Sequence, residues 1–409
     1  MNHDTQWIPL IDPGDYIDEY NEYQIVNLIQ AGGCGCVYLV RAINPDANEQ
    51  ISLDTIRKQY HYGLNVEHIR KWNLAALKIA RPDGKYNYTT HIVDEHRYLQ
   101  MINHSSVVSL YRNPFRKTTN HYRGEYKPVS SKKITSTNGV SYDYKYIIMN
   151  FECGGSLQSY LQEIQRPLNQ YQVVGLIIQI ANVLNYLHKN IGIVHRDITP
   201  KNILFRNPIS MWRYTIPEIV LIDFGCIETL NHKYKLRSIP FTTFPYGAPE
   251  IEKNMNAHHM NDIYSLGIIF YELLAGFSIN NKVILSLDQV NSKINKDLAS
   301  IVMDCINPDV NERNKKIGSA EELIKKITLF SDQKRSGIKR KTPNYIKIIA
   351  VIIIALIIIL SIILSINLIQ IQSKKVDTLT SIPSITSLPL ATPSPLPTAK
   401  PTTTRIPQP

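Results

Sequence analysis

Apolar residues fall into short strand-like runs in the first half of the chain and into longer helix-like runs in the second half. Residues 23–42 hold two runs rich in Val, Ile, Leu and Tyr on either side of a glycine-rich turn, which predicts a β-hairpin. Residues 73–84 predict another short strand, and residues 89–104 have the apolar spacing of a helix. The first hundred residues are therefore predicted to form mostly strands, with one helix.

Further along, the apolar runs lengthen. Residues 142–165 read as a strand, a Gly-Gly break and a helix, and residues 171–190 carry one apolar stripe that predicts a core helix. Residues 218–226 predict an apolar strand that ends in "DFG", and residues 261–276 predict a very apolar helix. The remainder to about residue 330 is expected to be helical.

The most apolar stretch lies near the end of the chain. Residues 348–366 hold 19 residues interrupted only by two serines, and no charge follows until Lys374. This length spans the hydrocarbon core of a bilayer, so a transmembrane helix is predicted over 348–372. A buried core helix is the alternative, but a helix of a soluble domain needs a polar face.

Six Lys or Arg residues lie between positions 334 and 347, against two just after the predicted span. The larger basic cluster stays inside the cell, which predicts cytoplasmic placement of residues 1 to about 345. Residues 373–409 are dominated by Pro, Thr and Ser, cannot pack a core, and are expected to form an extended extracytoplasmic tail. The N-terminal residues 1–22 are polar and show no signal peptide.

Composition excludes several classes of function. The net charge is +11, but much of it is the local basic run before the apolar span, with almost no interleaved aromatic residues. A nucleic-acid partner is therefore not expected. The five cysteines are odd in number and lack metal-ligand spacing, which favours reduced thiols in a cytosolic domain.

Candidate chemistry gathers at a few positions. Glycines in the first hairpin allow backbone N–H groups to approach phosphate oxygens, although such a hairpin is often only a turn. Lys78 lies in a buried-looking strand and must have a partner, unless it reaches water from an edge strand. The loop "HRDITPKN" (195–202) crowds His, Arg, Asp, Lys and Asn together, and Asp223 ends a strand where a metal and phosphate could lie.

These pieces occur in a fixed order: glycine loop, strand lysine in "AALK", helix glutamate, "HRD" loop, "DFG" and "APE". In this order the chain resembles the eukaryotic-type Ser/Thr protein kinase family, in particular its bacterial membrane-anchored receptor-type members. The resemblance covers residues 23–330 and implies an α+β bilobal fold, with a small β-rich N-lobe and a larger helical C-lobe. The expected order of domains is an extension (1–22), the kinase domain (23–330), a basic juxtamembrane segment (331–347), the span (348–372) and the tail (373–409).

The resemblance also implies roles for individual residues. Asp197 orients the substrate hydroxyl and accepts its proton, Lys78 contacts the α- and β-phosphates and pairs with Glu95, and Asn202 with Asp223 holds Mg²⁺, or Mn²⁺ in its place. The expected ATP-binding residues are Gly32, Gly33, Gly35, Val37, Ala76, Lys78, Met149, Asn150, Phe151 and Glu152. Structural roles are implied for Glu250, which would pair with Arg313, and for Asp262, which would brace the "HRD" backbone. Candidate phosphorylation sites in the activation loop are Thr229, Ser238, Thr242 and Thr243, and Thr243 aligns with a substrate-contacting threonine.

The chain departs from the family at two kinds of position. Thr199 stands where these kinases usually place a Lys that contacts the γ-phosphate, and Gln30 replaces the first glycine of the loop. Lys201, tighter Mg²⁺ occupancy, or a hydrogen bond from Thr199 to Asp197 are the possible compensations. Two insertions, residues 43–72 and 116–139, are expected to be surface loops of the N-lobe.

The predicted function is therefore ATP-dependent phosphorylation of Ser/Thr hydroxyls of proteins by a single-pass protein of the cell membrane, with a role in signalling. Two alternatives stay open: a weak or inactive pseudokinase that acts as a membrane-bound scaffold, and a small-molecule phosphotransferase of the same fold. The second is disfavoured by the joint presence of "DFG", "APE" and Asp262. The protein substrates are not predicted, and a homodimer for trans-autophosphorylation is a possible assembly.

Overall fold

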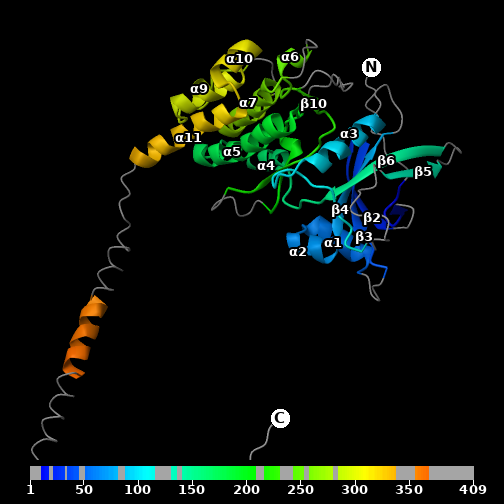
Figure 1. The fold of residues 1–409 in the computed structure, drawn as a ribbon, viewed down its shortest axis with the longest axis horizontal. Coiled ribbons are helices and arrows are strands. Elements are labelled where there is room, and N and C mark those ends of the chain that lie inside the picture. The colour runs from blue at the N-terminus through cyan, green and yellow to red at the C-terminus, as the bar shows by residue number, and fades with distance from the viewer. Residues whose placement is uncertain are drawn as a thin grey trace, which may run out of the picture. The chain divides into compact units, whose positions relative to one another are not determined.

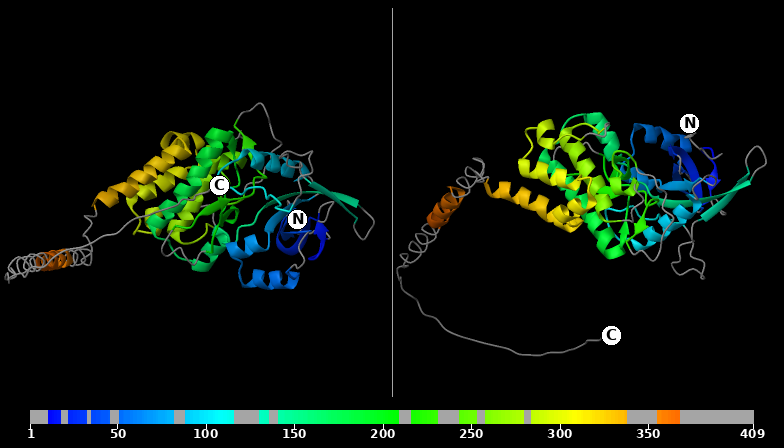
Figure 2. Two further views of the ribbon diagram at one scale, coloured as in Figure 1. Left: turned by 60° about the horizontal axis from the view of Figure 1, so that its bottom comes forward. Right: turned by 90° about the horizontal axis from the view of Figure 1, so that it is seen from above.

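In the computed structural model, the described residues are 11–17, 22–32, 35–45, 51–81, 88–115, 130–135, 141–208, 216–230, 243–252, 258–279, 284–337 and 355–367. The chain divides into two units, Met1–Gly337 and Ile338–Pro409. The first unit has two lobes, one built on a β-sheet and one built of helices (Figures 1 and 2). This arrangement is the α+β bilobal fold that the resemblance implies.

The small lobe is built on a six-stranded sheet with the order β1-β2-β3-β4-β6-β5. Every neighbouring pair in this sheet is antiparallel. The strands are β1 Tyr16–Ile17, β2 Tyr23–Gly32, β3 Gly35–Ala42, β4 Leu74–Ala80, β5 Ser130–Thr135 and β6 Ser141–Asn150. The predicted hairpin at 23–42 is β2–β3, and the predicted strand at 73–84 is β4.

The insertion at residues 43–72 is not a surface loop, and that prediction was wrong. It contains two helices, α1 Leu53–Tyr62 and α2 Val66–Lys71, each with an N-cap side chain that accepts a backbone N–H. Ile56 and Leu64 are buried against Val26 and Leu39 of the sheet. Both helices are short, with 10 and 6 residues, so their contribution to the core is visible only once the sheet faces them.

The second insertion, 116–139, was also predicted to be a loop. Its described part, β5, pairs along its whole length with β6 from Ser130↔Tyr146 to Thr135↔Ser141. The prediction is therefore wrong for these residues, and the others of this insertion lie outside the described residues. β5 is rich in Ser and Lys, a composition that gives no strand signal and suits the edge of a sheet.

Helix α3 Tyr88–Met101 packs against β4 and β6 of the sheet, and it lies apart from α1 and α2 (Figure 1). It corresponds to the helix predicted at 89–104. Its residues Ile92 and Leu99 are buried in the core that continues into the large lobe. This packing turns Glu95, which is 1% exposed, inward.

The large lobe is mainly helical. Its long helices α5 Gln170–Tyr186 and α7 Met260–Ala275 pack together, and every residue of α7 is buried. The remaining helices are α4 Leu157–Ile164, α6 Pro249–Glu252, α8 Leu287–Val290, α9 Lys296–Cys305, α10 Val310–Ile317 and α11 Ala320–Gly337. Four short strands lie next to the loop of residues 195–202 and the "DFG" segment: β7 Ile193–Val194, β8 Ile203–Phe205, β9 Ile219–Leu221 and β10 Glu228–Thr229.

The predicted ion pair between Glu250 and Arg313 is confirmed. The Arg313 guanidinium is fully buried, contacts the Glu250 carboxylate and donates to the carbonyl oxygen of Met260. Asn261 donates to the same carboxylate at 2.7 Å. A buried ion pair keeps its charges only with such additional hydrogen bonds, so this cluster ties α6, α7 and α10 together.

A histidine beside this cluster makes stability depend on pH. Burial, together with His259, Arg313 and His188, lowers the pKa of His258 from 6.5 to about 4, and its Nδ1 accepts the N–H of Met260. The folded protein therefore resists a proton that the unfolded chain accepts below about pH 6.5. The stability that His258 contributes is fully present above about pH 6.5 and is lost as the pH falls toward 4.

We expect His258→Gln to flatten this dependence, by on the order of 1–2 kcal/mol between pH 6.5 and 4.5 because the side chain is only partly buried. Thermal unfolding across that range is the measurement, with exposed His61→Gln as the matched control. Parallel curves for His258→Gln and the parent protein would contradict the assignment.

In the second unit, a helix is described over residues 355–367. Its large apolar side chains are half or more exposed, with Ile363 at 50% and Leu360 at 70%. Within the described ranges, no helix combines the length and the apolar character that crossing a membrane requires. The other residues of the predicted span, 348–354 and 368–372, lie outside the described residues.

Candidate active site

The glycine hairpin ends the β2–β3 pair, with Gly32 opposite Gly35. Gly33 lies outside the described residues. Gly35 has φ +155°, and a Cβ there would lie 2.0 Å from the carbonyl oxygen of Ile79 in β4. Only glycine fits this close approach of two strands. Val37 faces Lys78 in the β3–β4 register, so the hairpin and the lysine are fixed to each other.

Lys78 joins two carboxylates. Its Nζ lies 2.6 Å from Glu95 Oε2 on α3 and 2.8 Å from Asp223 Oδ1, which follows β9. Glu95 also accepts the N–H of Phe224 at 3.1 Å. The predicted pair of Lys78 and Glu95 is therefore present, and it links the sheet, α3 and the "DFG" segment in one network of charges.

The charges of this network stabilise one another. Burial lowers the pKa of Lys78, but Asp223 and Glu95 raise it more, so the pKa lies above its ordinary value. Burial raises the pKa of Asp223, but Lys78 lowers it more, so the net shift is downward. Burial also raises the pKa of Glu95, and there Lys78 offsets only part of the effect. The lysine is thus held as a cation beside the ionised Asp223.

Helix α7 holds the backbone of the catalytic loop, residues 195–202, through Asp262. The buried carboxylate of Asp262 accepts the backbone N–H groups of His195 and Arg196 at 2.9 and 2.8 Å and contacts His188 Nε2 at 2.8 Å. The predicted bracing role is confirmed. Arg196 and Asp223 both have φ +66°, a left-handed conformation that is uncommon for residues other than glycine. Such strain persists only where the surroundings impose it, and here Asp262 and the Lys78 network do so.

Asp197 is held by contacts to both of its carboxylate oxygens. Asn202 Nδ2 donates to Oδ2 at 2.7 Å, and Thr243 Oγ1 donates to Oδ1 at 2.9 Å. Lys201 Nζ lies 3.8 Å from Oδ2 and is also among the groups that lower the pKa of Asp223. Lys201 therefore lies within electrostatic range of both aspartates.

Thr199 does not hydrogen-bond Asp197, so that possible compensation is wrong. Its side chain is 1% exposed, and its hydroxyl has no hydrogen-bond partner among the described residues. A buried hydroxyl without a partner costs free energy, on the order of 1–3 kcal/mol. Of the compensations considered, Lys201 is the one that the geometry supports.

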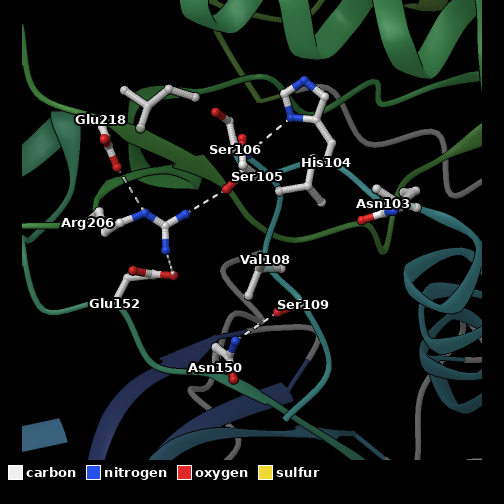
Figure 3. Close-up of a pocket in the computed structure, with 13 residues that line it drawn as sticks. Asn103, His104, Ser105, Ser106, Val108, Ser109, Asn150, Glu152, Arg206 and Glu218 are labelled. Carbon is white, nitrogen blue, oxygen red and sulfur yellow. Dashed lines mark hydrogen bonds and ion pairs between the residues drawn. The ribbon is translucent and has the colours of Figure 1, made fainter. Parts of the chain in front are cut away.

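Two of the hinge residues, Asn150 and Glu152, have side-chain partners in the structure. Met149 is buried and faces Ala76 in the β4–β6 register. Asn150 and Glu152 line a cavity of about 680 Å³ together with residues of the 102–109 segment and Arg206 (Figure 3). There Asn150 donates to Ser109 Oγ at 2.7 Å, and Arg206 lies 3.4 Å from Glu152. The side chains of Asn150 and Glu152 are thus engaged by Ser109 and Arg206, which leaves the backbone groups of these two residues for the predicted contact with adenine.

The predicted phosphorylation sites fall into two groups. Thr229 lies in β10, opposite Ile193, and Thr243 donates to Asp197. Ser238 and Thr242 lie outside the described residues. Thr243 is therefore placed at the carboxylate, as expected of a substrate-contacting threonine, and a phosphate ester there would remove its O–H donor.

The residues present fit a magnesium ion that arrives with a nucleotide. Among the described residues, no group of three or more His, Cys, Asp or Glu side chains could hold a metal alone. Asp223 nevertheless keeps a carboxylate that is 38% exposed, and Asn202 uses its amide nitrogen toward Asp197, which leaves its amide oxygen free of that bond. Mg²⁺ is commonly held by one or two such oxygens together with phosphates of the substrate.

Glu228 is a site residue that the sequence analysis did not predict. Its carboxylate lies 2.6 Å from Arg196 Nη1, and both side chains are largely buried. The signal that could have found it is a lone acid in the short strand after "DFG". The role of Glu228 follows only from the pairing of β10 with β7, because β7 comes immediately before the catalytic loop.

Comparison with known proteins agrees with this geometry. Residues 64–343 match the family described as protein kinase domain, a range that begins after the β2–β3 hairpin. The chain is 27% identical over 229 residues to the probable serine/threonine-protein kinase gdt4 of Dictyostelium discoideum, covering 56% of this chain and 12% of that protein. It is 30% identical over 193 residues to the Aurora kinase of Saccharomyces cerevisiae, covering 44% of this chain and 49% of that one.

The chain thus spans less than half the length of each of these two relatives. Among solved structures, it resembles the PknI kinase domain of Mycobacterium tuberculosis with 18% identity and a TM-score of 0.49, covering 78% of this chain and 98% of that one. The family match covers more than half of the residues of the chain. The chain belongs to the protein kinase domain family.

Proposed function

We propose that this protein transfers the γ-phosphoryl group of ATP to Ser or Thr hydroxyls of proteins. The observation that carries the proposal is the position of Asp197, whose two carboxylate oxygens are held by Asn202 and Thr243. A carboxylate held in this way is set to orient an incoming hydroxyl and accept its proton. The relatives named as serine/threonine kinases support the same acceptor class.

Lys78 would contact the α- and β-phosphates. It is kept cationic by Glu95 and Asp223, and the Glu95 pair holds it in place from α3. Asp223 and Asn202 would hold Mg²⁺ or Mn²⁺, which when bound neutralises charge on the phosphates. These chain groups act by fixed position and charge, which is what phosphoryl transfer through a loose transition state requires.

A pseudokinase is the second candidate, and one observation favours it: Thr199 supplies no charge where the family usually has a lysine. Transfer of ³²P from [γ-³²P]ATP to casein, with Mg²⁺ present or removed by EDTA, separates the two. We expect labelled Ser and Thr in casein that depends on Mg²⁺. Binding of Mg²⁺-ATP without any transfer would instead support the scaffold.

Lys201 is the group that we expect to replace the missing lysine. It lies near both Asp197 and Asp223, so its removal takes away a cation beside the transferring phosphate. Lys201→Ala is therefore expected to lower kcat by about tenfold or more. Thr199→Lys is expected to change kcat by no more than about twofold, because the charge is already supplied.

Steady-state kinetics with the same acceptor measures both variants. Lys316→Ala, which removes an exposed lysine paired with Asp304 in the large lobe, is the matched control. A tenfold rise for Thr199→Lys together with no loss for Lys201→Ala would contradict this assignment.

We also propose that the protein is a single-pass protein of the cell membrane, with its kinase domain cytoplasmic, as in receptor-type signalling. The support is the uncharged sequence 348–366, the six basic residues before it and the exposed apolar side chains of the helix at 355–367. An apolar surface of this kind is unfavourable in water. The test is recovery of the protein in the membrane fraction after a carbonate wash, together with protease treatment of intact cells. We expect the protein to stay in the membrane fraction and only its tail to be cleaved from outside. Release of the protein into the wash would contradict this proposal.

A further inference from the structure

We infer that Glu228 is a positioning residue that holds Arg196, and through it the catalytic loop, without an activation-loop phosphate. The inference rests on the proposed function, since it concerns how the same site is kept in order. It goes beyond that function because it predicts that the unphosphorylated protein is already competent.

Arg196 is the residue directly before Asp197, and its backbone is fixed by Asp262. Its side chain is only 8% exposed. A guanidinium keeps its charge at any ordinary pH, so burial requires an acidic partner. Where a kinase chain provides no such partner, a phosphate on the activation loop is the general alternative, because a phosphate pairs well with arginine.

Here the chain provides the partner itself. Glu228 Oε2 lies 2.6 Å from Arg196 Nη1, and the Glu228 side chain is 17% exposed. The strand register places Glu228 at this position. Glu228 is paired with Val194 in the β10–β7 register, and Val194 lies two residues before Arg196. The short strand pair thus delivers a carboxylate to the arginine of the catalytic loop and leaves little of the arginine for another anion.

The same contact links two parts of the site. Glu228 follows Asp223 by five residues, so the segment that carries the metal-facing aspartate is fastened to the loop that carries Asp197. Arg196 has φ +66°, a conformation that relaxes unless it is held. Loss of the carboxylate would leave a buried unpaired charge beside this strained residue, and the loop would move to solvate it.

The first test replaces the charge and keeps the shape. In the full-length protein, Glu228→Gln is expected to lower kcat for casein by about tenfold or more, with the KM for ATP within about twofold of the parent, because the phosphate contacts are untouched. Glu228→Asp retains the charge and should recover part of the loss. Glu218→Gln, which removes an exposed carboxylate paired with Arg206, is the control and should leave kcat unchanged.

The second test removes phosphate. The parent protein is treated with a protein phosphatase, checked by intact mass, and assayed for initial rate before new phosphate accumulates. We expect it to keep at least about half of its kcat, since Glu228 and not a phosphate neutralises Arg196. Loss of activity that returns only after incubation with Mg²⁺-ATP would overturn the inference, as would full activity of Glu228→Gln.

A third readout does not depend on activity. Backbone hydrogen exchange of the peptide covering residues 193–199 should become faster in Glu228→Gln and stay unchanged in Glu218→Gln. Unchanged exchange in Glu228→Gln would overturn the inference even if the protein were an active kinase. Faster exchange in a protein that transfers no phosphate in any state would uphold the positioning role and refute the proposed function instead.

Discussion

Asp197→Asn is expected to lower kcat by about 10³-fold, within the 10²–10⁴ that a positioned general base contributes. The amide keeps the size of the carboxylate and an oxygen acceptor for Thr243, but it cannot accept the proton of the substrate hydroxyl. Lys78 and Asp223 are untouched, so affinity for Mg²⁺-ATP should stay close to that of the parent. Single-turnover transfer and nucleotide binding, measured separately, test both halves of the expectation.

The matched control is Asp297→Asn, which changes an exposed aspartate at the start of α9. It should have no effect on either measurement. Transfer by Asp197→Asn at close to the parent rate would show that another group takes the proton. A comparable loss of nucleotide affinity would show that Asp197 acts in binding and not in the transfer step.

Lys78→Met is expected to lower kcat/KM by a similar factor, about 10³-fold, because one preorganised cation on the phosphates is lost together with its anchoring of α3. It should also destabilise the fold by about 3 kcal/mol near pH 7, since Glu95 and Asp223 would face each other without their shared cation. Thermal unfolding and steady-state kinetics are the two measurements.

A double variant separates the two effects. Lys78→Met with Glu95→Gln removes the buried unpaired carboxylate, and it should regain part of the lost stability without regaining activity. If Lys78→Met is as stable as the parent, the carboxylates do not depend on the lysine in the way described. If the double variant is less stable than Lys78→Met alone, Glu95 is held by other contacts, such as the N–H of Phe224.

Much of the site could be predicted because its residues stand in short local motifs. The pair of Lys78 and Glu95, the bracing by Asp262, and the pair of Glu250 and Arg313 are all present as expected. Each of these residues belongs to a segment whose spacing is fixed by a strand or helix. The apolar spacing of α5 and α7 likewise predicted the core of the large lobe.

The sequence did not predict features that depend on a distant partner. The helices α1 and α2 are short and pack on β2, β3 and β4, so their segment read as a loop. β5 is polar and becomes a strand because β6 offers it an edge. Glu228 could not be predicted because only the pairing of two two-residue strands brings it to Arg196. Lys201 likewise lies near Asp197 only because of the turn of the catalytic loop.

Autophosphorylation of the purified full-length protein in detergent, mapped by mass spectrometry, tests the central claim most directly. The phosphatase-treated protein is incubated with Mg²⁺-ATP, and Asp197→Asn is treated in parallel. The account predicts new phosphate on Ser or Thr residues of the parent protein, with none in Asp197→Asn. Nucleotide binding by the parent without any new phosphate, or equal phosphorylation of both proteins, would contradict it.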